Sequence, residues 1–302
     1  MIVLYPLDPL DRHRPDDAYA TEAAVAERLG IPWALIDHDA VVQGEAGRAV
    51  RQVPSRDSQT TAVYRGWMMT ADQYGLFYQA LAARGVRLVN TPDAYRHCHH
   101  LPESYPVIEG HTPRSVWLPV AGEIDRDEVM DLLRPFGDAP LVIKDYVKSQ
   151  KHAWAEACFI PSASDRPAVE RVVRRFLELQ GPDLAGGLVF REFVELEPVG
   201  RHPRSGMPLT LEYRLFCLDG RPLLCAKYWE EGDYRGEGPP VERFTALAAK
   251  VRSRFFTMDV AKRRGDDWLV VELGDGQVAG TPEEANIEAF YSGLADGLGR
   301  AE

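Results

Sequence analysis

The sequence contains no apolar stretch approaching the ~18 residues that a membrane helix needs. Its amino-terminal run, MIVLYP, has no basic leader and is too short for a signal peptide. Four cysteines without a CxxC pair are too few for a disulfide scaffold in 302 residues, so we expect reduced thiols. Basic residues are in deficit, with 35 Lys and Arg against 46 Asp and Glu and a formal charge of −11. This balance disfavours nucleic acid and anionic membranes as partners. We expect a cytoplasmic protein, and the sequence does not indicate its oligomeric state.

Common nucleotide-binding fingerprints are also missing. The chain has no GxxxxGK[ST] loop and no GxGxxG after a strand, so any nucleotide site is built differently. The run His97–His100 resembles a metal cluster, but adjacent residues on a helix point in different directions and zinc needs about four convergent ligands. We therefore do not predict a zinc site. The tripeptide Arg264-Gly265-Asp266 is explained by a hairpin turn.

The order of apolar patterns indicates an α/β layer followed by an α+β region. The first hundred residues alternate short apolar runs with amphipathic segments, which is typical of a parallel sheet covered by helices. The expected strands are 2–5, 31–37, 61–67 and 86–90, with helices at 16–30 and 70–83. After residue 111 we expect helices at 125–134 and 282–298, a strand at 140–147, a long helix ending near Gly181 and two hairpins. The Pro-, Gly- and Arg-rich segment 197–210 is predicted to be an exposed insertion.

The last hairpin places two acids opposite one another. Gly265-Asp266 predicts a two-residue turn, which pairs Arg264 with Asp267 and therefore Asp259 with Glu272. Their Cβ atoms are then roughly 4.5–5.5 Å apart. The other face is expected to be apolar core, formed by Phe256, Met258, Val260, Leu269, Val271 and Leu273.

Two facing carboxylates destabilise a strand pair unless a cation or a shared proton resolves them. Oxygen ligands with this spacing suit Mg²⁺, which takes one or two carboxylates together with water and phosphates. The alternative is a pair of solvated acids, or partners of a nearby arginine such as Arg254.

A second hairpin turns at Asp219-Gly220 and is predicted to place Glu212 opposite Lys227, with Arg214 on the same face. In isolation this pair is equally explained as a surface salt bridge. Lys144, which interrupts an apolar strand, either snorkels from an edge or ends the strand in a site.

Basic and hydroxyl residues follow Lys144. The patch contains Lys148, Ser149, Lys151 and His152, and it is either a phosphate-binding patch or an exposed loop. Arg65 follows a predicted parallel strand, where ligands of open α/β sheets bind, and is a ligand candidate.

The order of these features resembles a divergent branch of the ATP-grasp superfamily: a strand lysine, the hinge Arg-Glu-Phe-Val, a charged hairpin, and Asp and Glu on a final hairpin. The resemblance covers essentially the whole chain. It implies a Rossmann-like preliminary domain at 1–110, followed by a two-lobed ATP-grasp fold with antiparallel sheets. The lobes are expected at 111–190 and at 191–302.

The resemblance also implies roles for single residues. Lys144 and Lys227 are similar to the phosphate-contacting lysines, and Glu212 to the acid on the ribose side. The hinge against adenine corresponds to Glu192, Phe193 and Val194.

Asp259 and Glu272 resemble the two magnesium ligands. The family's Asn two residues later is Gly274 here, so Asp275 is expected to substitute as a third ligand. His99-His100 stands where many relatives have Asp-Lys, and the phosphate loop lacks its usual glycines. Lys148, Lys151 and Arg214 are expected to compensate.

Membership of this family implies ATP and Mg²⁺ as cofactors, and an ATP-dependent, ADP-forming carboxylate–amine ligase that works through an acyl phosphate. Lys144, Arg214 and Lys227 are the expected catalytic cations, and Arg65 and Arg254 the expected substrate contacts. Substrates would be a small-molecule or peptide carboxylate and an amine. The alternatives are a small-molecule phosphotransferase and a non-catalytic nucleotide-binding or interaction protein.

Overall fold

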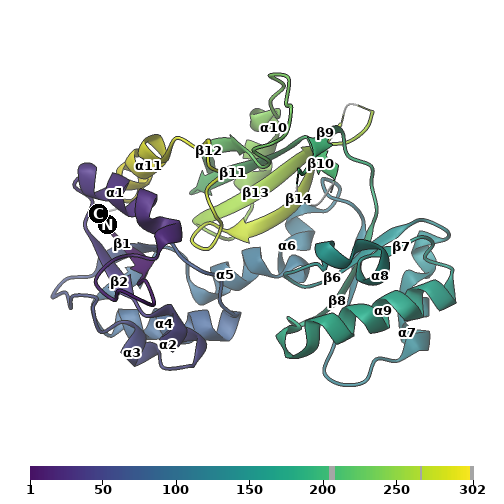
Figure 1. Ribbon diagram of the computed structural model, residues 1–302, viewed down its shortest axis with the longest axis horizontal. Helices are drawn as coiled ribbons and strands as arrows, with labels where there is room; N and C mark the ends of the chain where they lie inside the picture. The colour runs from purple at the N-terminus through teal and green to yellow at the C-terminus, as the bar shows by residue number, and fades with distance from the viewer. Residues whose placement is uncertain (204–207, 266, 300–302) are drawn as a thin grey trace.

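The computed structural model describes residues 1–203, 208–265 and 267–299. Its first part is a fully parallel sheet with the strand order β2-β1-β3-β4, as the alternating sequence pattern predicts (Figure 1). The strands are β1 (Ile2–Pro6), β2 (Trp33–Ile36), β3 (Thr60–Tyr64) and β4 (Val86–Leu88). The helices are α1 (Ala20–Arg28), α2 (His38–Val42), α3 (Ala46–Ala49) and α4 (Ala71–Ala82), with a 3₁₀ turn, η1 (Asp17–Tyr19), before α1.

Local signals account for the ends of α4. Thr70 and Gln73 form a reciprocal capping box at its start, which satisfies amide groups that otherwise have no partner. Gly85, just beyond its end, has φ of +74°, a conformation that glycine adopts at little cost. The predicted helix 70–83 is therefore confirmed within a residue at its end.

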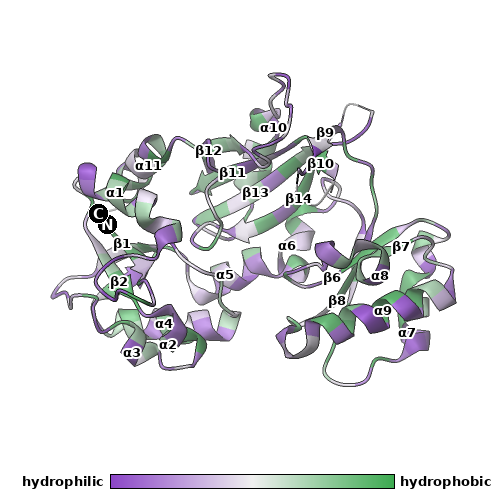
Figure 2. Cartoon of the chain, viewed as in Figure 1, coloured by the Kyte–Doolittle hydropathy of each residue, from purple (hydrophilic) through white to green (hydrophobic). Residues whose placement is uncertain are grey.

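The second sheet is antiparallel and has the order β5-β8-β6-β7. Its strands are β5 (Ser115–Pro119), β6 (Leu141–Asp145), β7 (Phe159–Ile160) and β8 (Gly187–Glu192). Its helices are α7 (Arg126–Leu133), α8 (Trp154–Ala157) and α9 (Arg166–Gln180), with 3₁₀ turns η2 (Arg134–Phe136), η3 (Lys151–Ala153) and η4 (Gly181–Asp183). Figure 2 shows hydrophobic and hydrophilic bands alternating along α9, whose buried residues recur at helical spacing.

The third sheet is antiparallel too, with the order β12-β11-β13-β14. Its strands are β11 (Glu212–Leu218), β12 (Arg221–Lys227), β13 (Phe255–Lys262) and β14 (Trp268–Asp275), and helix α10 (Val241–Ala248) packs on it. The segment 197–210 forms a short ribbon of β9 (Pro198–Arg201) and β10 (Pro208–Thr210), and its residues 204–207 lie outside the described part.

Two connections hold the sheets together. Helices α5 (Pro92–His99) and α6 (Leu101–Ile108) run from the parallel sheet past β14 toward the second sheet (Figure 1). The last helix, α11 (Ile287–Gly299), returns to pack between α1 and β12. One apolar cluster therefore contains side chains from β1, β11, β13 and α11, so the amino-terminal sheet and the third sheet share a core.

The mixed α/β fold class with antiparallel sheets is as predicted, while the domain limits at 110 and 190 stay predictions. The last helix begins at Ile287 and not near 282. Within the ranges described, no helix is both long and apolar enough to span a bilayer.

The β13–β14 hairpin corrects one step of the sequence argument. Arg263, and not Arg264, bonds to Asp267, and the partner Asp266 of the predicted turn lies outside the described residues. The register then shifts by one residue between Asp259 and Val260. This bulge brings Asp259 opposite Glu272 after all.

The same bulge changes which residues of β14 face the core. Trp268 and Val270 join the cluster with Phe256, Met258 and Val260, in place of the predicted Leu269 and Val271. Val271, the extra residue of the bulge, is only half-buried.

The β11–β12 hairpin departs from its predicted pairing. Asp219 and Gly220 have φ of +48° and +74°, which confirms the predicted type I′ turn. A bulge follows between Phe216 and Cys217, however, so Lys227 pairs with Tyr213. The predicted Glu212–Lys227 pairing is wrong by one position.

Met258 tests the assignment of the two faces of β13. It is fully buried on the face opposite Asp259, so Met258→Ala should lower the free energy of unfolding by about 2–5 kcal/mol, since it leaves a cavity. Leu10→Ala, at a position that is 94% exposed, should change it by less than about 0.5 kcal/mol. Urea denaturation of both variants is the measurement. Equal, small effects would contradict a buried apolar face.

Candidate functional site

Two acids and two cations meet where β11, β13 and β14 come close to β6. Arg214 lies directly opposite Asp259 on the neighbouring strand, and its Nε and Nη2 donate to the two carboxylate oxygens at 2.8 and 2.7 Å. Lys144 reaches Glu272 from the second sheet, with Nζ 3.3 Å from Oε2. The structure therefore brings together Lys144, Arg214, Asp259 and Glu272, as the sequence predicts.

The charges of this centre are strongly coupled. Burial by itself raises the pKa of Glu272, but Lys144, Lys151 and Arg214 outweigh it and lower that pKa to about 2. Burial raises the pKa of Asp259 against the opposing effect of Arg214. Glu272 therefore carries a firm negative charge, and Asp259 depends on Arg214 for its own.

Glu212 lies at the start of β11 and is buried. Burial, followed by repulsion from Asp259, raises its pKa to about 8, and Lys151 opposes this shift. The hydroxyl of Thr210 lies 3.3 Å from its Oε2. Glu212 is thus mostly protonated at neutral pH and is equipped to donate or accept a hydrogen bond.

The basic loop after Lys144 is organised by a buried carboxylate. Oδ1 of Asp145 accepts from the amides of Val147 and Lys148 at 2.6 and 2.5 Å, and Oδ2 accepts from Gln180 and from the amide of Ala185. Gln180 in turn accepts from Gln150 at the far end of the loop. Because these loop amides are already bonded, anions at this loop would be met by the side chains of Lys148 and Lys151.

Those two lysines are exposed, yet their charges reach the centre. Lys151 lowers the pKa values of Glu272, Asp259 and Glu212, and Lys148 lowers that of the buried His99. The predicted basic patch therefore faces the carboxylate pair.

The hinge residues continue β8 and leave the second sheet. The amide of Phe193 donates to the carbonyl of Pro140, and Glu192 lies 3.6 Å from Arg114. The ring of Phe193 packs against Phe159 and Trp154 with centroids 5.2 and 6.0 Å apart. With half-buried Val194, the hinge supplies an apolar and aromatic surface, to which sequence reasoning did not assign Trp154 and Phe159.

Three further residues of the centre were missed in the sequence. Arg191 donates to Thr112 and to the carbonyl of Val270. Burial lowers its pKa to about 10, against the attraction of Glu272. Tyr228 lies under Arg214, with 4.9 Å between the guanidinium carbon and the ring centroid. His99 stacks on Tyr95, and burial, with help from His100 and Lys144, lowers its pKa to about 3.

Only one of these had a local signal. Arg191 stands two residues after Val189, which pairs with Lys144, so alternation puts Arg191 on the face of Lys144 once the register is known. Tyr228 and His99 carry no such signal.

Comparison with known proteins agrees with this geometry. The family model described as an ATP-grasp domain, the third family of its clade, matches residues 135–294, which is more than half of the chain. This chain belongs to that ATP-grasp family. The matched segment includes every residue of the carboxylate centre, from Lys144 to Glu272.

ATP-grasp structures share the fold at low sequence identity. D-cycloserine synthetase DcsG superposes with a TM-score of 0.56 at 13% identity and covers 99% of this chain and 100% of its own. The ATP-grasp ligase PsnB, complexed with minimal precursor, Mg and ADP, gives 0.56 at 14%, covering 99% and 98%. The D-alanine-D-alanine ligase from Coxiella burnetii gives 0.57 at 14%, covering 99% and 94%. No curated protein matches the sequence significantly.

Within the ATP-grasp framework, the structure corrects the predicted third metal ligand. Asp275 alternates away from Glu272 along β14, and its carboxylate accepts from Asn90 and from both nitrogens of Gln277. Among the described residues, no three His, Cys, Asp or Glu side chains form a metal-binding group. The chain supplies two carboxylates, not three.

Lys227 also departs from its predicted role. Its ammonium pairs with Glu284 at 3.0 Å and lies 5.6 Å from the ring of Tyr234. Since paired residues share a face, Lys227 lies on the face of Tyr213 and not on that of Arg214. We therefore leave it out of the phosphate-binding set.

The two predicted substrate arginines are engaged elsewhere. Arg65 has no exposed surface and is bound to Glu22 and to two backbone carbonyls. Arg254 forms a two-point ion pair with Asp219 at the tip of the β11–β12 hairpin. Neither is free to meet a substrate in this structure.

Glu212 gives a pH test of the ATP-grasp centre. Its pKa of about 8 exceeds the ordinary 4.5, so the folded protein holds a proton that the unfolded chain loses between these values. The free energy of unfolding should therefore fall as pH rises through this window. Glu212→Gln should flatten that fall in urea denaturation between pH 5 and 8. Glu45→Gln, on an exposed helix start, should keep the wild-type slope, and an unchanged slope in Glu212→Gln would contradict a protonated Glu212.

Proposed function

We propose that this chain is an ATP-dependent, ADP-forming carboxylate–amine ligase that makes an amide or peptide bond. The observation that carries the proposal is the carboxylate pair Asp259–Glu272, held between Arg214 and Lys144. An acid pair flanked by cations from two sheets suits a polyphosphate and its metal ion better than it suits a neutral ligand.

The donor set fits Mg²⁺. Asp259 and Glu272 offer oxygen ligands on neighbouring strands, and no third protein carboxylate joins them within the described ranges. Mg²⁺ usually takes one or two carboxylates and completes its shell with water and phosphate oxygens. Bound there, the ion would neutralise charge on the phosphates. Both carboxylates would then exchange their contacts with Arg214 and Lys144 for contacts with the ion.

The cations released in this exchange have a use. Arg214, Lys144 and Lys151 surround the position where phosphate oxygens would lie, and positive charge at a transferring phosphoryl group stabilises the charge that develops in phosphoryl transfer. The aromatic surface of Phe193, Phe159 and Trp154 would receive the adenine ring. Glu212 would accept a ribose hydroxyl.

The reaction needs no nucleophile from the protein. A substrate carboxylate oxygen attacks the γ-phosphorus, and ADP leaves. The amine then attacks the acyl carbon, phosphate leaves and the amine loses one proton. The chain contributes binding, orientation and charge. Both substrates are proposed to be small molecules or peptides.

Acceptor dependence tests the reaction class. The wild-type protein should release ADP from ATP only when an acid and an amine are both present, across pools of amino acids and short peptides. Mass spectrometry should find a product lighter by one water than the sum of the two substrates. Phosphorylated product without amide would instead establish a phosphotransferase. No ADP with any pool, together with tight nucleotide binding, would indicate a non-catalytic protein.

The carboxylate pair can be tested separately. Asp259→Asn and Glu272→Gln should each lower kcat by about 10²–10³-fold, as loss of one preorganised electrostatic group typically does. Asp233→Asn changes the same functional group on an exposed loop and should keep wild-type activity. Wild-type kcat in both pair variants would overturn the proposed site.

A further inference from the structure

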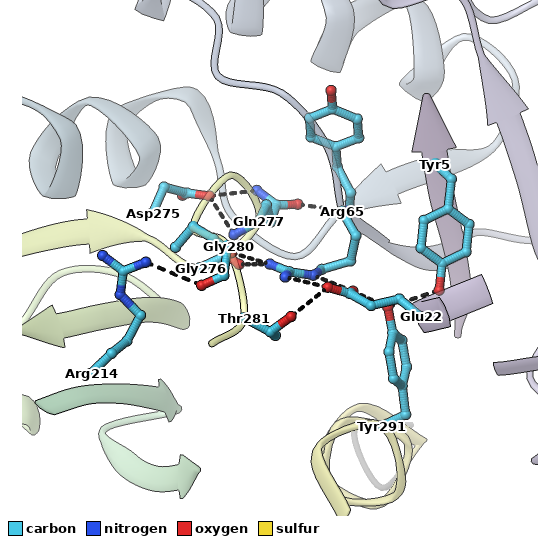
Figure 3. A network of polar contacts seen from close by, with 12 residues as sticks. Tyr5, Glu22, Arg65, Arg214, Asp275, Gly276, Gln277, Gly280, Thr281 and Tyr291 are labelled. Atoms are coloured by element: carbon cyan, nitrogen blue, oxygen red, sulfur yellow. Dashed lines mark hydrogen bonds and ion pairs between the residues drawn. The ribbon is translucent and has the colours of Figure 1, made fainter. Parts of the chain in front are cut away.

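A short loop after β14, residues 276–281, is fastened to the amino-terminal sheet (Figure 3). Nη1 of Arg65 donates to the carbonyls of Gly276 and Ala279 at 2.5 and 2.8 Å. Gln277 accepts from the amide of Tyr64 through its side chain and from that of Gly66 through its carbonyl, each at 3.2 Å. The loop therefore follows the end of β3.

Glu22 on α1 completes this fastening. It accepts from Nε and Nη2 of Arg65, both at 2.9 Å. It also accepts from the hydroxyl of Thr281, at the end of the loop, at 3.0 Å, and from that of Tyr291 on α11 at 2.6 Å. One buried ion pair thus links α1, β3, α11 and both ends of the loop.

The loop also touches the carboxylate centre. Nη1 of Arg214 donates to the carbonyl of Gly280 at 3.1 Å, while its other two nitrogens bind Asp259. Gly280 lies between Ala279 and Thr281, which Arg65 and Glu22 hold. The guanidinium of Arg65 also lies 5.6 Å from the ring of Phe216, two residues after Arg214 on β11.

We propose that Glu22 and Arg65 are positioning residues for Arg214. They fix the Gly280 carbonyl, which fixes the guanidinium that orients Asp259. This inference rests on the proposed function, because positioning Asp259 matters only if that carboxylate works. Displacements well under 1 Å in a supporting shell change catalytic geometry measurably.

The proposal predicts a non-additive pair of substitutions. Arg65→Lys keeps the charge but cannot make all four hydrogen bonds, and it should lower kcat about tenfold in the wild-type background. In the Arg214→Lys background, where the bond to Gly280 is already lost, the same substitution should cost less than about twofold. Residues that act through one network show such coupling, whereas independent sites multiply.

A second readout does not depend on turnover. Calorimetry of ADP binding over a range of Mg²⁺ concentrations should show Arg65→Lys shifting the half-saturating Mg²⁺ upward, and no further shift in the double variant. Arg243→Lys is the matched control, since this arginine ties α10 to Asp267 beside β14 through an exposed pair and does not touch the loop. It should leave both readouts unchanged.

Thr281→Val covers the case in which Arg65→Lys does not fold. It removes one hydroxyl contact with Glu22 and should give a smaller loss with the same non-additivity. Equal losses in both backgrounds, or wild-type kcat and Mg²⁺ dependence in Arg65→Lys, would overturn the inference. If the wild type makes no product with any acceptor, the proposed function fails, and the Mg²⁺-dependent ADP binding still decides whether Arg65 acts through Arg214.

Discussion

Two carboxylates facing each other on adjacent buried strands form the constraint on which the rest of the site depends. Asp259 and Glu272 repel, and burial makes the repulsion worse because little water is present to screen it. The structure resolves this with Arg214 from the same sheet and Lys144 from another. Neutralising the pair thus requires both antiparallel sheets to stand in register with each other. A bound metal ion and its phosphates would meet the same requirement in another way.

The loop after Lys144 shows how this chain departs from a glycine-rich phosphate loop. Glycine loops offer free amides to an anion, and glycine permits the backbone to approach closely. Here the amides of Val147 and Lys148 are bonded to the buried Asp145. The loop is therefore shaped by a side chain of the protein. Lysine side chains are left to carry the interaction with anions.

Sequence reasoning located the elements and the facing acids because turn chemistry and strand alternation are local signals. It failed where a bulge adds a residue, since no residue type announced the extra Val271 or the shift after Phe216. The first bulge was harmless for Asp259 and Glu272, whereas the second moved Lys227 to the opposite face. Asp275 and Arg65 were misjudged for another reason. Their partners, Asn90 and Glu22, lie more than forty residues away in the sequence, so only the tertiary fold shows that they are already occupied.

The most direct test of the account is a crystal structure of the protein with Mg²⁺ and a non-hydrolysable ATP analogue. We predict Mg²⁺ bound by Asp259 and Glu272, with Arg214 and Lys144 turned toward the phosphates and adenine against Phe193. Asp275 should keep its contacts with Asn90 and Gln277. A nucleotide bound elsewhere, or an Asp259–Arg214 pair unchanged beside a bound nucleotide, would contradict the account.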